Sequence, residues 1–155
     1  MVKFKSVTLQ FDGSCQPNPG KGGEGYVIMN DDDESIIMEG YFPVRPDCTN
    51  NVAEYFGLFK GLKALKNSKH TAEHLNIEGD SDLVIKQMRK EYKVRKNRIF
   101  IIMKMSESMV SKLTRGDYYN NHSFRHIERK SNAKADALAR KAVEADEPWI
   151  NDHYE

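Results

Sequence analysis

The stretch FDGSCQPNPG, residues 11–20, decides how this chain folds. Its first two residues complete a longer pattern, because residues 3–12 alternate apolar and polar side chains. This alternation predicts a half-buried strand that ends at Asp12. Beyond it, residues 13–23 (GSCQPNPGKGG) are rich in glycine and proline, which predicts a turn. Because a carboxylate is costly to bury, an aspartate at the end of an apolar strand is a candidate functional group.

Three other acidic residues stand in comparable surroundings: Glu54 in TNNVAEYFGLFKGL, Asp80 in NIEGDSD and Asp136 in SNAKADALA. Asp80, like Asp12, ends a predicted strand, which is where open sheets with helical crossovers place ligand-binding residues. Glu54 lies in the first turn of a predicted helix and Asp136 near the start of another, where the helix dipole alone would favour a carboxylate. Each acid taken singly therefore has a structural explanation. Together they favour a divalent metal site, because converging carboxylates repel one another unless a cation neutralises them.

Hydrophobic periodicity divides the rest of the chain into strands and helices. Strands are predicted at 25–29, 35–42, 74–80 and 122–128, with a loop at 43–49. Helices are predicted from Asn50 to Leu65, from Ser81 to Arg89, from Asn97 to Leu113, and from Asn132 or Ser131 to Val143. Thr49 or Asn50 can cap the first helix, and Ser81 the second. This order predicts an antiparallel meander joined to parallel units in one mixed sheet, with helices packed on it.

The size and composition indicate one domain. With 155 residues and 39% apolar content, the chain can bury a substantial core, and we expect a domain over 1–145 followed by a surface tail over 146–155. No apolar run approaches the roughly 20 residues of a membrane span. The N-terminus lacks the apolar core of a secretory signal, so we expect a cytoplasmic protein with no membrane partner. Two cysteines, Cys15 and Cys48, are too few for a disulfide framework or a zinc site, which fits a reducing compartment.

Basic residues are concentrated in residues 86–104, which we call the basic segment. The net charge of the whole chain is only +1, yet this segment has eight cations and one anion, Glu91. The cations are Lys86, Arg89, Lys90, Lys93, Arg95, Lys96, Arg98 and Lys104. Such a run is most often a solvated helix face, although it is also the footprint of a phosphate-binding surface. By itself the run favours the solvated face.

Two other patterns are weaker indications of function. Residues 20–25 (GKGGEG) match the spacing of a dinucleotide-binding loop, but a strand follows where that loop requires a helix, so a connection between antiparallel strands is favoured. The five histidines form no metal-binding pair of the HExxH type, and none stands close in sequence to Ser14 or Ser81 as a catalytic partner. His126 stands ten residues before Asp136, and a lone histidine of this kind is more often structural than catalytic.

Four segments, taken together and in order, resemble ribonuclease H of type 1 over about residues 4–145. FDGSCQPNPGKGGEGYVI is similar to the first strand and turn of that family, and TNNVAEYFGLFKGLKAL to the helix with its essential glutamate. IEGDSDLVIKQM is similar to the strand that ends in Asp-Ser, and HIERKSNAKADALARKA to the terminal segment. The resemblance implies a ribonuclease H-like α/β fold, whose five-stranded mixed sheet has three antiparallel strands followed by two parallel ones, with helices on both faces.

The resemblance also implies roles for individual residues. Two Mg²⁺ ions, with Mn²⁺ as a substitute, would be held by four carboxylates: Asp12, Glu54, Asp80 and Asp136. His126 would assist the attacking water or product release, although in some relatives a nearby arginine, here Arg129, takes that part. The residues implied to contact the substrate are Gly13, Ser14, Asn18, Asn50, Asn51, Lys93, Arg95 and Lys96. The chain lacks the separate basic protrusion of larger members and resembles the compact subgroup.

The implied activity is hydrolysis of the RNA strand of an RNA/DNA hybrid by a two-metal mechanism in a monomeric enzyme, leaving 5′-phosphate and 3′-hydroxyl ends. The basic segment would then hold phosphates of the DNA strand, which reverses the interpretation that charge alone favours. Three alternatives are a junction resolvase or 3′–5′ exonuclease of the same superfamily, a non-catalytic module that binds hybrid or double-stranded RNA, and the nuclease domain of a reverse transcriptase. The Asp-Gly-Ser and Thr-Asn-Asn strings favour ribonuclease H over the first, and the acids argue against the second because they would repel phosphate without a metal.

Overall fold

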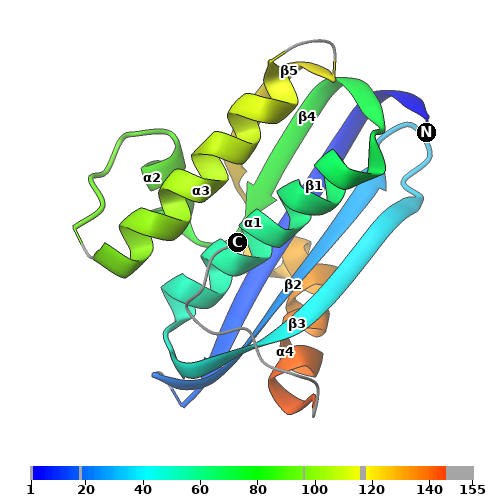
Figure 1. Cartoon of the computed structure of the whole chain (residues 1–155). Coiled ribbons are helices and arrows are strands. Elements are labelled where there is room, and N and C mark those ends of the chain that lie inside the picture. The colour runs from blue at the N-terminus through cyan, green and yellow to red at the C-terminus, as the bar shows by residue number, and fades with distance from the viewer. Residues whose placement is uncertain (1, 18, 96, 116–117, 146–155) are drawn as a thin grey trace.

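The computed structural model describes residues 2–17, 19–95, 97–115 and 118–145, which form one sheet covered by helices (Figure 1). In chain order the elements are β1 (Lys3–Gln16), β2 (Gly20–Asn30), β3 (Ile36–Cys48), α1 (Asn50–Ser68), β4 (Thr71–Gly79), α2 (Asp82–Met88), α3 (Asn97–Thr114), β5 (Tyr119–His126), the short 3₁₀ helix η1 (Arg129–Asn132) and α4 (Ala133–Glu144). The predicted order of strands and helices is confirmed. The expected tail, 146–155, lies outside the described residues.

The five strands form a mixed sheet in the order β3-β2-β1-β4-β5. Strand β2 pairs antiparallel with β1 and β3, and β4 pairs parallel with β1 and β5. Helices α1 and α3 lie on one face of the sheet, and α4 packs on the other (Figure 1). The predicted fold class is therefore confirmed. None of the helices in the described part of the chain is long and apolar enough to cross a membrane.

The hairpin between β1 and β2 corrects the predicted turn. Strand β1 continues beyond Asp12, and β2 begins at Gly20, so most of residues 13–23 is paired strand. One of the glycines that indicated a turn instead leaves room for a helix, since a Cβ at Gly23 would lie 2.5 Å from the backbone nitrogen of Val143 on α4. The glycines at positions 23 and 25 therefore reflect the close packing of α4 on β2.

Strand β3 corrects a second prediction. Two prolines indicated a loop over residues 43–49, yet β3 runs to Cys48. Because β3 is at the edge of the sheet, its prolines need not donate hydrogen bonds to a neighbour on the outer side. The longer strand leads directly to Thr49, whose side chain accepts a hydrogen bond from the Val52 N–H and caps α1 as predicted.

The main hydrophobic core lies between the sheet and α1. Side chains of β1 and β4, including Leu9, Phe11 and Ile77, are buried together with Leu58 and Leu62 of α1. Burying side chains of this size contributes about 1.5–3 kcal/mol each. Helix α1 is therefore held firmly on β1, and any functional group that it contributes has a defined position relative to that strand.

One acidic side chain is buried in this core. Glu24 on β2 is 1% exposed, and its Oε2 atom has no hydrogen-bond partner within the described residues. Its cross-strand neighbour is Gly13, and the nearest influential cation is Lys60 on α1. Burial raises the pKa of Glu24 well above its usual value, and the charge of Lys60 opposes the shift only in part. The buried position therefore favours the neutral carboxyl group.

We expect Glu24→Met to raise the free energy of unfolding by about 1–3 kcal/mol at pH 8, because it removes a buried polar atom that has no partner. The difference in free energy of unfolding between Glu24→Met and the wild type should grow as the pH rises. The native state keeps the Glu24 proton while the unfolded chain loses it near the ordinary pKa of 4.5, so the wild type loses stability as the pH rises from that value toward the folded pKa. Urea unfolding at pH 5 and pH 8 measures the effect. Glu39→Gln, at an exposed position on β3, is the control, and an equal advantage at both pH values would contradict the argument.

Candidate active site

The parallel pairing of β1 with β4 brings two of the predicted acids side by side. Phe11 and Gly79 are the last paired residues, so Asp12 and Asp80 follow directly on neighbouring strands. Strand β4 ends at this level while β1 continues, and Ser81 caps α2 as predicted. The sheet is therefore open beside Asp12, and side chains from both of its faces can meet there.

Helix α1 contributes Glu54 from one face of the sheet. Because Thr49 is the cap, Glu54 is the fifth residue of the helix, and the prediction that it lies in the first turn is wrong. Its Oε2 atom is buried and has no hydrogen-bond partner among the described residues. Burial, with a smaller effect from the charge of Asp80, raises the pKa of Glu54 to about 8 against the opposing hydrogen bond from Ser81. The helix dipole therefore does not explain this carboxylate.

Asp12, Glu54 and Asp80 form a compact group of carboxylates. One oxygen from each residue lies within 4.8 Å of the others. Burial raises the pKa of Asp12 to about 8, and the negative charges of Asp80 and Glu54 add to the shift. Without a cation, this group therefore resists full ionisation near neutral pH. Carboxylate oxygens are the ligands that Mg²⁺ and Mn²⁺ prefer, so the donor set fits a divalent metal of this kind.

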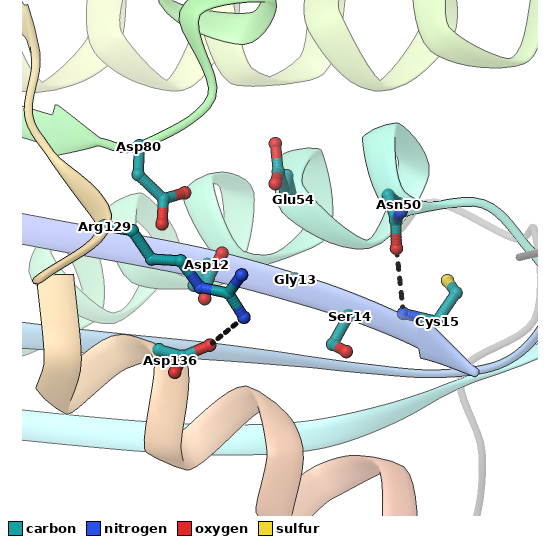
Figure 2. A pocket seen from close by; sticks show the side chains of 9 residues that line it. All are labelled: Asp12, Gly13, Ser14, Cys15, Asn50, Glu54, Asp80, Arg129 and Asp136. Atoms are coloured by element: carbon teal, nitrogen blue, oxygen red, sulfur yellow. Dashed lines mark hydrogen bonds and ion pairs between the residues drawn. The ribbon is translucent and has the colours of Figure 1, made fainter. Parts of the chain in front are cut away.

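Helix α4 brings Asp136 to the same pocket from the opposite face of the sheet. Asp136 lies in the first turn of α4, as predicted, and lines the pocket without belonging to the 4.8 Å group. Two cations flank its carboxylate: Arg129 Nη2 is 3.8 Å from Oδ1, and Arg140 Nε is 3.2 Å from Oδ2. Figure 2 shows the Arg129 side chain reaching across the pocket toward Asp136. The fourth predicted acid is thus close to the other three but is engaged with arginine.

A buried amide connects α4 to β1. Asn132 has no exposed surface, and its Nδ2 atom donates a hydrogen bond of 2.9 Å to the carbonyl oxygen of Phe11. The sequence places Asn132 or Ser131 at the start of the last helix, and the Asn132 side chain makes no capping bond there. Because Phe11 precedes Asp12 and Asn132 precedes α4, this contact sets Asp136 at a fixed place relative to Asp12. The position of Asn132 at the start of a helix does not reveal a partner 121 residues away in the sequence.

The acids line a pocket of about 390 Å³ beside the end of β4 (Figure 2). Three of the predicted contact residues line this pocket: Gly13, Ser14 and Asn50. Three others line a second pocket: Asn51, Lys93 and Arg95. The remaining two, Asn18 and Lys96, lie outside the described residues. The Oδ1 atom of Asn50 accepts a hydrogen bond of 3.0 Å from the backbone N–H of Cys15. This bond holds the start of α1 against the end of β1, on the side of the pocket away from Asp136.

The two candidate helper residues are placed differently. His126 is the last residue of β5, is exposed, and has its Nε2 atom 3.3 Å from the backbone oxygen of Asp80. Arg129 lines the acidic pocket, whereas His126 is not among the lining residues. Arg129 is therefore on the wall of the acidic pocket and His126 is not, and the role of each residue stays a prediction.

Comparison of the sequence with known proteins finds consistent matches. A family model described as reverse transcriptase-like matches residues 10–142. A bifunctional protein of Mycobacterium tuberculosis is 32% identical over 139 residues, which cover 90% of this chain and 36% of the relative. A ribonuclease H of Chlorobium luteolum is 30% identical over 149 residues, which cover 90% of this chain and 97% of the relative. The chain thus spans 36% of the length of the mycobacterial relative and nearly all of the second protein.

Solved structures match the fold as well. The N-terminal RNase H domain of the M. tuberculosis protein has a TM-score of 0.79 at 28% identity, covering 90% of this chain and 94% of that one. LC11-RNase H1, a protein isolated from compost and solved in complex with an RNA/DNA hybrid, has a TM-score of 0.73 at 29% identity, covering 88% of this chain and 96% of that one. The architecture described above is therefore shared with both proteins.

Proposed function

The chain belongs to the ribonuclease H family, and on that premise we propose that it hydrolyses the RNA strand of RNA/DNA hybrids, leaving 5′-phosphate and 3′-hydroxyl ends. The observation that supports this most directly is the group Asp12, Glu54 and Asp80, with carboxylate oxygens within 4.8 Å of one another in an open pocket. A relative with the same fold was solved in complex with an RNA/DNA hybrid, which makes that duplex the leading substrate.

In the proposed mechanism, two divalent ions, Mg²⁺ or Mn²⁺, would be held by Asp12, Glu54, Asp80 and Asp136. Such ions, when bound, lower the pKa of an attacking water and neutralise charge on the scissile phosphate. The protein supplies the positions: the register of β1 and β4 sets Asp12 against Asp80, and Asn132 sets the start of α4. Asp136 would hold a metal ion in place of its contact with Arg129, and the Arg129 guanidinium would then be free to bind a non-bridging phosphate oxygen.

Recognition of the hybrid is proposed to rest on the shape of an A-like minor groove and its 2′-hydroxyl groups. Short polar groups around Ser14 and Asn50, beside the acids, are suited to contact the RNA strand. Fewer cations of the basic segment are available for phosphate binding than its charge indicates, because four of them form ion pairs with neighbouring acids. These four are Lys86, Arg89, Lys90 and Lys104. Lys93 and Arg95 line a pocket with Asn51 and form no ion pair within the described residues, so we assign the DNA-strand phosphates to them.

Cleavage of a labelled hybrid tests the proposed function. The full chain with Mg²⁺ or Mn²⁺ should cut only the RNA strand, and EDTA should abolish the reaction. Parallel reactions with single-stranded RNA, duplex DNA and a four-way junction should yield no products. Digestion of the fragments with a 5′-phosphate-dependent exonuclease identifies their ends. An uncut hybrid with either metal, under a broad range of conditions and with protein that is folded by circular dichroism, would overturn the proposal.

We expect Arg129→Ala to slow hybrid cleavage by about 10–100-fold, because a charge-assisted hydrogen bond to phosphate contributes about 1.5–3 kcal/mol. His126→Ala should have a smaller effect, since His126 does not line the acidic pocket. Lys130→Ala is the matched control, because Lys130 is an exposed neighbouring cation that pairs with Glu128. Single-turnover rates at saturating enzyme separate the chemical step from binding. If His126→Ala slows cleavage more than Arg129→Ala does, His126 and not Arg129 is the helper residue.

A further inference from the structure

Two buried thiols lie against each other beside the candidate active site. Cys15 on β1 and Cys48 at the end of β3 are free cysteines whose Sγ atoms are 2.7 Å apart. Strand β2 runs between β1 and β3, so a side chain of β2 would ordinarily separate the two. Here the residue paired with Cys15 is Gly22, and a Cβ on it would lie 2.4 Å from the Sγ atom of Cys48. The sulfurs meet because that position has no side chain.

The thiol pair joins two parts of the pocket wall. Cys15 lines the acidic pocket, and its backbone N–H donates to the side chain of Asn50. Cys48 directly precedes Thr49, the cap of α1, and its thiol donates a hydrogen bond of 3.2 Å to the Thr49 carbonyl oxygen. A covalent bond between the sulfurs would therefore tie the end of β1 to the start of α1, the helix that contributes Glu54.

We propose that Cys15 and Cys48 form a redox-responsive modification site, which closes to a disulfide in the presence of low-molecular-weight disulfides and reopens under reducing conditions. The sulfurs have to approach from 2.7 Å to about 2.05 Å, a movement of well under 1 Å. In a reducing compartment such a pair is kept as the dithiol, and intracellular disulfides of this kind are usually transient and redox-sensing. The effect on cleavage, described below, rests on the proposed hydrolysis of hybrids.

The chemistry is two successive thiol–disulfide exchanges. Cys15 reacts first because it lines the pocket, whereas Cys48 is fully buried, and its hydrogen bond with Cys15 together with burial raises the pKa of Cys48. The Cys15 thiolate attacks a disulfide RSSR, forming the mixed disulfide Cys15–S–SR and releasing RS⁻. Cys48 then loses its proton to solvent and attacks the Cys15 sulfur, which forms the bond between the cysteines and releases the second RS⁻. The two cysteines lose two electrons and two protons, and RSSR becomes two RSH.

Mass spectrometry at defined redox ratios tests the modification site. The full chain is equilibrated with 2-hydroxyethyl disulfide and 2-mercaptoethanol, quenched with acid, and alkylated at the remaining thiols. The oxidised protein should lose ~2 Da, yield a cross-linked peptide containing both cysteines, unfold at a higher temperature and return to the dithiol with dithiothreitol. Cys48→Ser should stop at the mixed disulfide on Cys15. A chain that remains a dithiol at oxidising ratios, or whose mixed disulfide never resolves, overturns the proposal.

Cleavage assays test the consequence for activity. The oxidised protein should cut hybrids at least about 5-fold more slowly than the reduced protein, because the bond shifts Thr49 and fixes Asn50 where the RNA strand is proposed to lie. Dithiothreitol should restore the rate, and Cys15→Ser, which keeps only the fully buried thiol of Cys48, should be insensitive to the oxidant. If the reduced protein cuts no hybrid, the proposed function fails while the mass result still decides the modification site. Equal rates for the reduced protein and for protein of confirmed oxidised mass would overturn the regulatory consequence.

Discussion

Asp12→Asn is expected to reduce the rate of hybrid cleavage by at least about 10³-fold. Asp12 directly follows the last paired residues of β1 and β4, and its carboxylate belongs to the same 4.8 Å group as Glu54 and Asp80. Asparagine preserves the size of the side chain but removes the charge that a divalent cation requires. Losing about 4 kcal/mol of transition-state stabilisation corresponds to about 10³ in rate. Single-turnover cleavage of a labelled hybrid with Mg²⁺ and with Mn²⁺ measures the loss, and a loss below ten-fold with both metals would contradict the assignment.

The same variant should be more stable than the wild type in metal-free buffer near pH 8. The pKa of Asp12 rises from 3.8 to about 8 on folding, so between these values the native wild type binds a proton that the unfolded chain has lost, and its stability falls as the pH rises. The amide that replaces the carboxyl group in the variant has no such proton to lose, so the stability of the variant should depend less on pH. Thermal unfolding in EDTA at pH 5 and pH 8 measures the difference, with Asp32→Asn at an exposed position as the control. A variant clearly less stable than the wild type in EDTA at pH 8 would show that Asp12 supports the fold and not a metal.

Local signals account for the parts of the fold that the sequence predicts correctly. Hydrophobic periodicity and capping side chains act within a few residues, which is why Thr49 and Ser81 were predicted as caps and are found as caps. The end of β1 depends instead on its pairing with β2 beyond Asp12, and the glycines there are compatible with a turn as well as with a strand under a close helix. Similarly, the prolines of β3 indicate a loop unless one knows that the strand is at the edge of the sheet.

In the candidate site, too, local sequence patterns predict some features and miss others. Each of the four acids has a distinctive sequence neighbourhood that singles it out as a candidate, and all four candidates line one pocket. The contacts that set their mutual positions join residues far apart in the sequence and leave no local pattern. Asn132 stands at the start of a helix but donates a hydrogen bond to the carbonyl oxygen of Phe11, 121 residues away. The meeting of Cys15 with Cys48 depends on a glycine in a third strand, which the spacing of the cysteines does not reveal.

Gly13→Ala is expected to lower the free energy of unfolding by about 3 kcal/mol, at the upper end of the range for overpacking. A Cβ at Gly13 would lie 2.2 Å from the carbonyl carbon of Ala53 and 2.2 Å from the backbone nitrogen of Glu54. Both atoms belong to the backbone of α1, which no rotation of a side chain can move aside. The helix therefore has to shift away from β1 to accept the added methyl group. Urea unfolding in metal-free buffer measures the loss of stability.

The same shift should reduce hybrid cleavage, because Glu54 is displaced from Asp12 by the movement of its own backbone. A misplacement of about 1 Å in a catalytic constellation costs about 10²-fold in rate, and added Mg²⁺ should recover only part of it. Gly40→Ala is the matched control: a Cβ there would lie as close as 2.7 Å to the Tyr26 side chain, which can rotate away, so stability and rate should change much less. Equal effects of the two substitutions would show that general crowding of the sheet, and not the approach of α1 to β1, sets the position of Glu54.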